Sequence, residues 1–166
     1  TSPLWPAAGV ALAAMLVCGL RSWPGVWSGA FVAYLWQDAS LSGAAVGSML
    51  ATGATVQALL GALLTRRFLS VAQPLSHERD VWRFLLLGGP LACTVSATVA
   101  SVVLASSDRL SMPAPTQWLL WWTGDTLGVL LFSPLVLLTW PGGKTFRPQR
   151  GTGVALPLLV IATLLV

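Results

Sequence analysis

The chain consists of continuous apolar segments that are separated by short polar or charged connections. Apolar residues follow one another without the alternation of a half-buried strand, and leucine and alanine predominate, so the segments predict helices and not the strands of a membrane β-barrel. A bilayer-spanning helix needs about 20 apolar residues, and most of the segments approach this length. The six predicted segments lie near residues 2–20, 24–37, 42–65, 82–105, 117–140 and from 153 onward.

The composition indicates that these helices lie in a membrane. Hydrophobic residues make up 55% of the chain and charged residues only 8%, so a soluble fold of this size would lack a polar surface to cover its core. Nine Trp, 16 Gly and 11 Pro suit helices that pack closely within lipid and meet its interfaces through tryptophan. We therefore expect an all-α, polytopic transmembrane helical bundle whose main surrounding is the lipid bilayer.

The first two segments predict a tight helical hairpin. Only Arg21, Ser22 and Trp23 separate them. Gly19 suits the end of the first helix, and Pro24 suits the first turn of the second, because glycine favours the ends of helices and proline their beginnings.

The distribution of basic residues predicts the orientation of the bundle. The connections near Arg21, from 66 to 83 and from 144 to 150 hold all of the nine basic residues except Arg109. Since cytoplasmic loops of bacterial membrane proteins are enriched in Lys and Arg, we expect these three connections on the cytoplasmic side of the inner membrane. The basic charge is then explained by the membrane surface. Because no basic stripe is interleaved with aromatic residues, we expect no nucleic-acid partner.

The orientation also predicts the extent of the domain. The first residues lie within one apolar stretch and the last within another. In the predicted orientation the first segment enters from outside, so one more helix at each end would place both termini in the cytoplasm. We therefore expect residues 1–166 to form a single integral-membrane domain that is incomplete at both ends and precedes a cytoplasmic output domain.

Asp125 is the main candidate for a functional residue, because it is the only ionisable residue deep within an apolar segment. A carboxylate in the bilayer is costly unless it is paired or protonated, and such residues mark either a functional site or a structural polar contact. Both interpretations remain open. The rise of a helix places Thr98 and Tyr34 near the depth of Asp125, and Trp121 and Trp122 precede it on the same segment.

Gln57 is a second polar candidate, but the same count places it on the order of 10 Å deeper than Asp125. Its alternative role is to bond the backbone of a neighbouring helix. Neither residue has a nucleophile and a base beside it, so we expect no catalytic residues. Cys18 and Cys93 lie within apolar segments and His77 is the single histidine, so we also expect no metal and no cofactor.

Small residues and prolines suggest how the helices pack. Gly43, Gly47 and Ala51 repeat at four-residue spacing, which lets a neighbouring helix approach closely and places this segment centrally in the bundle. The neighbour is either another helix of the chain or a second copy in a homodimer. Pro90 and Pro134 interrupt their segments and are candidate hinges, although such prolines are also ordinary in transmembrane helices.

Several motifs, in this order along the chain, resemble the MASE1 family of bacterial membrane-associated sensor domains. The stretch WWTGD is the most specific of them. The motifs are WPAAGVALA at 5–13, RSWPG at 21–25, GAF at 29–31, QALLG at 57–61, RR at 66–67, RDV at 79–81, WWTGD at 121–125 and PL at 134–135. The chain departs from the family pattern at 54–57, where ATVQ stands in place of an Asn-Thr-Leu-Glu pattern, and at Tyr34, where an Asn is frequent.

The resemblance implies an input module of about eight helices without enzymatic activity of its own. It implies a cytoplasmic output domain in the same chain, either a histidine kinase of a two-component system or an enzyme that makes or degrades cyclic di-GMP. One relative is thought to receive its signal from a partner transporter, so a partner membrane protein is a further expectation. The alternatives are a transporter or proton pathway, and a docking module for another membrane protein.

Overall fold

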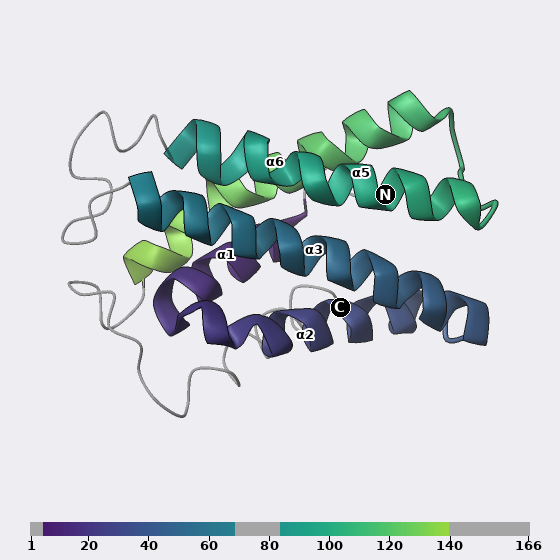
Figure 1. The fold of residues 1–166 in the computed structure, drawn as a ribbon, viewed down its shortest axis with the longest axis horizontal. Coiled ribbons are helices and arrows are strands. Elements are labelled where there is room, and N and C mark those ends of the chain that lie inside the picture. The colour runs from purple at the N-terminus through teal and green to yellow at the C-terminus, as the bar shows by residue number, and fades with distance from the viewer. Residues whose placement is uncertain (1–4, 69–83, 140–166) are drawn as a thin grey trace.

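The computed structural model describes residues 5–68 and 84–139, and this part of the chain is helical (Figure 1). The predicted all-α fold is therefore confirmed for the described residues. The number of about six segments is not confirmed, because the segment predicted from 153 lies outside them. The elements are α1 (Pro6–Cys18), the 3-10 turn η1 (Leu20–Ser22), α2 (Trp23–Gln37), α3 (Leu41–Phe68), the π-helical segment η2 (Phe84–Leu91), α5 (Ala92–Ser106) and α6 (Ala114–Thr139).

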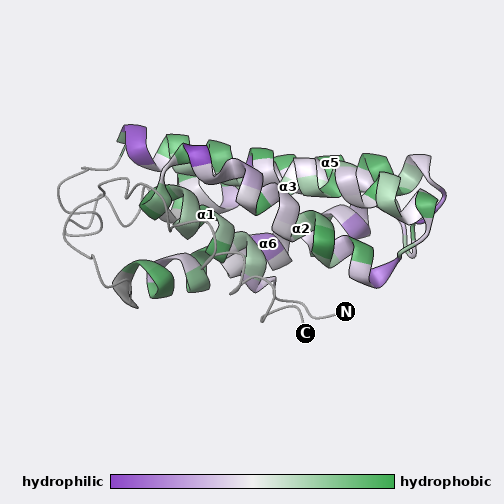
Figure 2. Cartoon of the chain, turned by 90° about the horizontal axis from the view of Figure 1, so that it is seen from below, coloured by the Kyte–Doolittle hydropathy of each residue, from purple (hydrophilic) through white to green (hydrophobic). Residues whose placement is uncertain are grey.

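Within the described residues, three stretches of helix are long and apolar enough to cross a membrane: Leu41–Phe68, Leu86–Ser106 and Ala114–Leu137. Large apolar side chains of α6, such as Leu119, Leu131 and Leu135, are exposed on the outside of the bundle. Hydrophobic residues cover the outer faces of the helices along the bundle, as Figure 2 shows. A helix that is apolar on its outer face as well as its inner face suits a lipid environment.

The long helix α3 is central, as its small residues predicted. It packs against α1, α2, η2 and α5, and α6 completes the bundle by packing on α1 and α5. Gly43 and Gly47 face α2: a Cβ atom on Gly47 would lie 3.0 Å from the Cβ atom of Tyr34, and one on Gly43 would overlap Asp38. Ala51 is fully buried. This stripe therefore makes contacts within the chain, and a homodimer stays a prediction.

The hairpin of α1 and α2 forms as predicted. Gly19 ends α1 with a φ of 92°, a conformation that glycine adopts without strain, and Pro24 lies in the first turn of α2. Arg66 of α3 stabilises the end of α1, since its Nη2 atom lies 2.8 Å from the carbonyl oxygen of Met15 and 3.2 Å from that of Leu16. These carbonyls belong to the last turn of α1, where partners within the helix are missing.

The contact between α1 and α6 is close enough for backbone to meet backbone. The amide of Trp5 donates to the carbonyl of Gly124 at 3.2 Å, and the Ser133 hydroxyl donates to the carbonyl of Gly9 at 2.9 Å. A Cβ atom on Gly128 would lie 2.0 Å from the carbonyl oxygen of Trp5. The glycines therefore permit an approach that any side chain would prevent.

The two prolines differ in their surroundings. Pro90 lies in the π-helical segment η2, where its carbonyl oxygen accepts a hydrogen bond from the indole Nε1 of Trp122 at 2.9 Å. Proline removes a backbone donor, which accounts for an irregular turn at this place. Pro134 lies within the continuous helix α6. That either residue acts as a hinge stays a prediction.

Polar contacts tie the connections together at one end of the bundle, which we name the Asp38 end. Arg109, between α5 and α6, binds the Asp38 carboxylate at 2.6 Å through Nη1 and the Ser42 hydroxyl at 3.0 Å through Nη2. The opposite end, which we name the Arg66 end, carries Arg21, Arg66 and Arg67. The basic residues predicted at 79–83 and 144–150 lie outside the described residues, and the orientation of the bundle stays a prediction.

We predict that Gly128→Ala and Gly9→Ala destabilise the bundle by about 1–3 kcal/mol, the usual effect of overpacking. In each variant the new methyl group would meet a rigid backbone carbonyl oxygen, at 2.0 Å for Gly128 and at 2.2 Å for Gly9. Gly61→Ala is the matched control, because its methyl group would lie 3.1 Å from the flexible end of Leu12 and 3.2 Å from the carbonyl oxygen of Gly88, clearly farther than in the other two variants. Unfolding by sodium dodecyl sulfate in bicelles measures the three free energies. An equal loss in all three variants would contradict the α1–α6 contact.

We predict that the Asp38–Arg109 pair stabilises the chain at neutral pH and stops doing so in strong acid. The hydrogen bond from Arg109, with further bonds from Ser40, lowers the pKa of Asp38 from its ordinary 3.8 to about 2. The unfolded chain therefore takes up the proton first, so the contribution is complete above the ordinary pKa and is lost as the pH falls through about 2. Thermal unfolding of the wild type and of Asp38→Asn should differ at neutral pH and converge near pH 2. A constant difference would exclude this pair as its source.

Candidate functional site

The carboxyl group of Asp125 is buried in the interior of the bundle. Its residue is 4% exposed, and the hydroxyl of Ser96 on α5, which is 2% exposed, donates a short hydrogen bond to Oδ2. None of the described Lys, Arg or His side chains lines the surrounding pocket. The carboxyl group thus lies in an apolar environment with a hydroxyl partner and without a cationic one.

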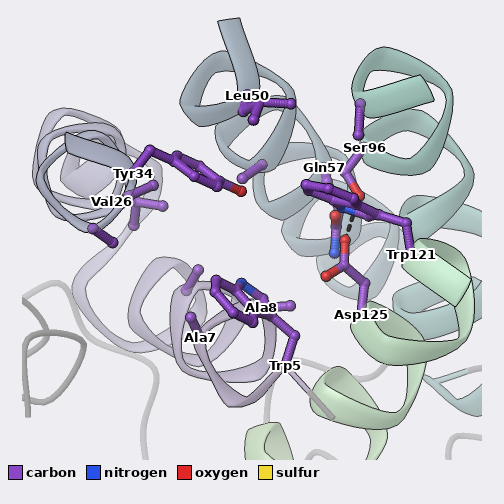
Figure 3. A pocket seen from close by; sticks show the side chains of 15 residues that line it. Trp5, Ala7, Ala8, Val26, Tyr34, Leu50, Gln57, Ser96, Trp121 and Asp125 are labelled. Carbon is purple, nitrogen blue, oxygen red and sulfur yellow. Dashed lines mark hydrogen bonds between the residues drawn. The ribbon is translucent and has the colours of Figure 1, made fainter. Parts of the chain in front are cut away.

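Asp125 opens onto a small cavity of about 40 Å³. A buried water needs about 10–15 Å³ of such space, so the cavity has room for only a few small molecules. All five α-helices contribute to its wall, and Figure 3 shows their side chains converging from around it. Most of the lining is alanine or other apolar residues. The polar and aromatic side chains that line it are Trp5, Tyr34, Gln57, Ser96, Trp121 and Asp125.

The polar side chains form a layer between two apolar clusters. Towards the Arg66 end, Leu12 and Met15 of α1 pack with Cys93 and Val129. Towards the Asp38 end, Leu50 of α3 packs with apolar residues of α5, and Trp121 and Tyr34 cover them. Along α3, α5 and α6, polar residues that line the cavity lie between these clusters. These residues are Gln57, Ser96 and Asp125.

Gln57 lines this pocket although its sequence position placed it deeper. The depth count fails because the helices do not begin at one level: α6 begins at Ala114, before the predicted 117, and α3 extends beyond it at the Asp38 end (Figure 1). Gln57 is 3% exposed, and its Nε2 donates to the sulfur of Cys93 at 3.2 Å. Its Oε1 atom is buried without a hydrogen-bond partner among the described residues.

The structure brings four of the six predicted pocket residues together: Asp125, Trp121, Tyr34 and Gln57. Thr98 and Trp122 lie elsewhere. The exposed Thr98 hydroxyl donates to the carbonyl of Thr94 at 2.7 Å and accepts a hydrogen bond from Trp118 at 3.1 Å. The indole of Trp122 is directed to Pro90.

The sequence reasoning missed two of the polar and aromatic lining residues, Trp5 and Ser96, and Ser96 is the one that bonds Asp125. A helix turns by about 100° per residue, so Thr98 lies about 200° around α5 from Ser96, on another face. Depth along the helix alone does not distinguish Ser96 from Thr98. The signal was present in the pattern of small residues, because Ser96 continues the buried stripe that Cys93 begins and that Ala97 and Ala100 extend.

The site offers hydrogen bonding and ion binding, and its described residues do not form a catalytic arrangement. Asp125 has a serine beside it, yet no histidine or second acid lines the pocket to activate that hydroxyl. No three His, Cys, Asp or Glu side chains come together within 5–68 and 84–139 as a metal-binding group. The acceptor groups that line the cavity are thus a carboxyl group, two hydroxyls and an amide oxygen.

We predict that Ser96→Ala lowers the free energy of unfolding by about 1–3 kcal/mol, because it removes the hydroxyl donor from a buried carboxyl group. Thr94→Ala is the control on the same helix, because its exposed hydroxyl bonds the carbonyl oxygen of Leu91 one turn earlier at 2.7 Å, so its loss should change stability by no more than about 0.5 kcal/mol. Denaturation by sodium dodecyl sulfate in bicelles compares the two. Equal effects would show that the Ser96–Asp125 bond contributes nothing of its own.

Comparison with known proteins accounts for this architecture. No curated protein and no solved structure shows significant similarity to the chain. The MASE1 family profile, in contrast, matches residues 1–166, the whole of the sequence. The family is one of sensory domains of the membrane, without a catalytic role. The all-helical bundle, its apolar spans and its WWTGD motif around the buried Asp125 thus belong to a member of the MASE1 family of membrane-associated sensor domains.

Proposed function

We propose that this membrane sensor domain controls a cytoplasmic output domain, a histidine kinase or a diguanylate cyclase or phosphodiesterase, by a cue that it receives in the Asp125 pocket. The observation that carries the proposal is the pocket itself. All five α-helices line it, so a change in its occupancy or charge alters contacts of every helix at once. A ligand shifts a conformational equilibrium only through such differential contacts.

Helix α1 supplies a route from the pocket to the Arg66 end. Ala7, Ala8 and Ala11 of α1 form part of the pocket wall, and the last turn of the same helix binds Arg66. A displacement of α1 at the pocket would therefore move the end of α3 as well. The link is a continuous physical contact between the pocket and the Arg66 end.

The proposed orientation places the Arg66 end in the cytoplasm of a bacterium, at the inner membrane. The three described arginines of that end support it through the preference of cytoplasmic loops for basic residues. The Asp38 end then faces outward, and the pocket is closed towards the cytoplasm by the apolar cluster of Leu12, Met15 and Val129.

A transporter or proton pathway is the second candidate function. It is favoured by the buried carboxyl group together with the π-helical segment around Pro90, because intramembrane acids and irregular helices mark ion pathways. Flux of protons or ions across proteoliposomes that contain the chain would support this function. Tight proteoliposomes without flux, combined with an altered output in Asp125 variants, would support the sensor.

We predict that Asp125→Asn changes the output activity of the protein that carries this chain, while its membrane insertion stays normal. Asparagine keeps the shape of the side chain but cannot be charged, so the pocket would be fixed in one electrostatic state. The output is measured as kinase or cyclic di-GMP activity in membranes, and insertion as the amount of protein in the membrane fraction. Asp108→Asn on the exposed α5–α6 connection is the matched control. Unchanged output in Asp125→Asn would remove the pocket from signalling.

A further inference from the structure

We propose that the Asp125 pocket binds a small monovalent cation, Na⁺ in the first instance, which takes the place of the carboxyl proton. This inference rests on the proposed function and gives it a cue of defined chemistry. It starts from the size of the cavity, which at about 40 Å³ is far below the roughly 300–1,000 Å³ of sites for organic ligands. An ion with at most a few waters is the class of ligand that fits.

A charged Asp125 requires a cationic partner, and the described residues do not supply one. Asp125 is 4% exposed, and an unpaired carboxylate in such surroundings is highly unfavourable. The described arginines are placed elsewhere: Arg109 binds Asp38, Arg66 binds carbonyls of α1, and Arg21 and Arg67 are exposed. The neutralising charge is therefore a proton or a bound cation.

The oxygen atoms around Asp125 suit a cation. The Oε1 atom of Gln57 is an acceptor that lies buried without a partner, on a side chain that lines the same cavity. The Ser96 hydroxyl has two acceptors within reach, Asp125 Oδ2 and, at 3.4 Å, the carbonyl oxygen of Cys93. When it donates to Cys93, its lone pairs are free to bind an ion. Figure 3 shows Gln57, Ser96 and Asp125 side by side, with the Tyr34 hydroxyl directed towards them from α2.

The single carboxylate favours a monovalent ion. One such ion would leave the site neutral, whereas a divalent ion would leave a net positive charge buried in the membrane domain. Divalent Ca²⁺ commonly takes 6–8 oxygen ligands, more than these side chains offer. Binding then exchanges charge for charge: Na⁺ enters, the carboxyl O–H bond of Asp125 breaks, and the proton leaves to solvent.

Two titratable groups face the cavity, Asp125 from α6 and Tyr34 from α2. Cys93 of α5 lies next to it through its contact with Gln57, and the lining residues of α1 and α3 contain no titratable side chain. Competition between Na⁺ and protons therefore depends on Asp125 in the first place. Acid should weaken Na⁺ binding, and alkaline conditions should strengthen it.

Equilibrium binding of radioactive sodium to the 166-residue chain in lipid nanodiscs tests the inference, with choline chloride keeping the ionic strength constant. We expect saturable binding of one ion per chain that weakens in acid, competition by Li⁺ more than by K⁺, and none by choline. Asp125→Asn should weaken binding by about tenfold or more, a change of about 1.4 kcal/mol. Gln57→Met, which keeps the length of the side chain and removes its oxygen, should weaken it about 3- to 10-fold.

The controls are Asp108→Asn, the same chemical change on the surface, and Thr98→Val, on a face of α5 outside the cavity. Both should bind sodium as the wild type does. Size-exclusion profiles identify variants that fail to fold. If a variant does fail, the acid dependence of sodium binding by the wild type tests the inference in its place. Binding that is not saturable, that choline displaces, or that Asp108→Asn weakens as much as Asp125→Asn overturns the inference.

Sodium binding and output activity, measured together on the protein that carries this chain, separate this inference from the proposed function. If Asp125→Asn alters the output but the wild type binds no sodium, the pocket signals through a proton or another cue and the cation site is wrong. If sodium binds at Asp125 and the output of the carrying protein responds neither to sodium nor to Asp125→Asn, the cation site is supported and the sensory role of the pocket is wrong.

Discussion

The bundle is organised around one buried carboxyl group and the serine that bonds it. Asp125 and Ser96 hold α6 to α5 in a region that is apolar on either side, and Gln57 of α3 completes the polar layer. The two apolar clusters would pack well without this layer. Retaining it lowers the stability that the interior could reach, since buried polar groups replace apolar contacts. Such a layer specifies how three helices align, and it leaves a cavity where a denser core could lie.

Small residues make this arrangement possible. Gly9 and Gly128 bring the backbones of α1 and α6 together, and Gly53 of α3 admits Val99 of α5. Within lipid the hydrophobic effect does not drive helices together, so close van der Waals contact and hydrogen bonds between helices are the stabilising interactions. The same close packing couples the helices. Under the proposed function, a displacement at the pocket would meet these packed neighbours and would be passed along α1 to the end of α3.

Much of the fold follows from the sequence, because apolar runs, Gly19 and Pro24 act locally and need no knowledge of neighbouring helices. The central position of α3 also followed, from its small residues. The pocket was predicted only in part. Its charge within an apolar segment identified Asp125, and depth along a helix identified Tyr34. The face on which a residue lies, however, depends on how the helices are rotated and staggered. For this reason the depth count points to Thr98 in place of Ser96, and it places Gln57 deeper in the bundle than the structure does.

Several contacts between helices end on main-chain carbonyls: Arg66 binds those of Met15 and Leu16, Trp122 that of Pro90, and Ser133 that of Gly9. A carbonyl is present whatever side chain its residue carries. Apart from Gly9, whose close approach to α6 admits no side chain, the acceptor positions can therefore vary in evolution without loss of the bond, while the donors cannot. Pairs of this kind leave little correlated substitution between their two positions, so contact maps inferred from covariation would tend to omit these links between the helices.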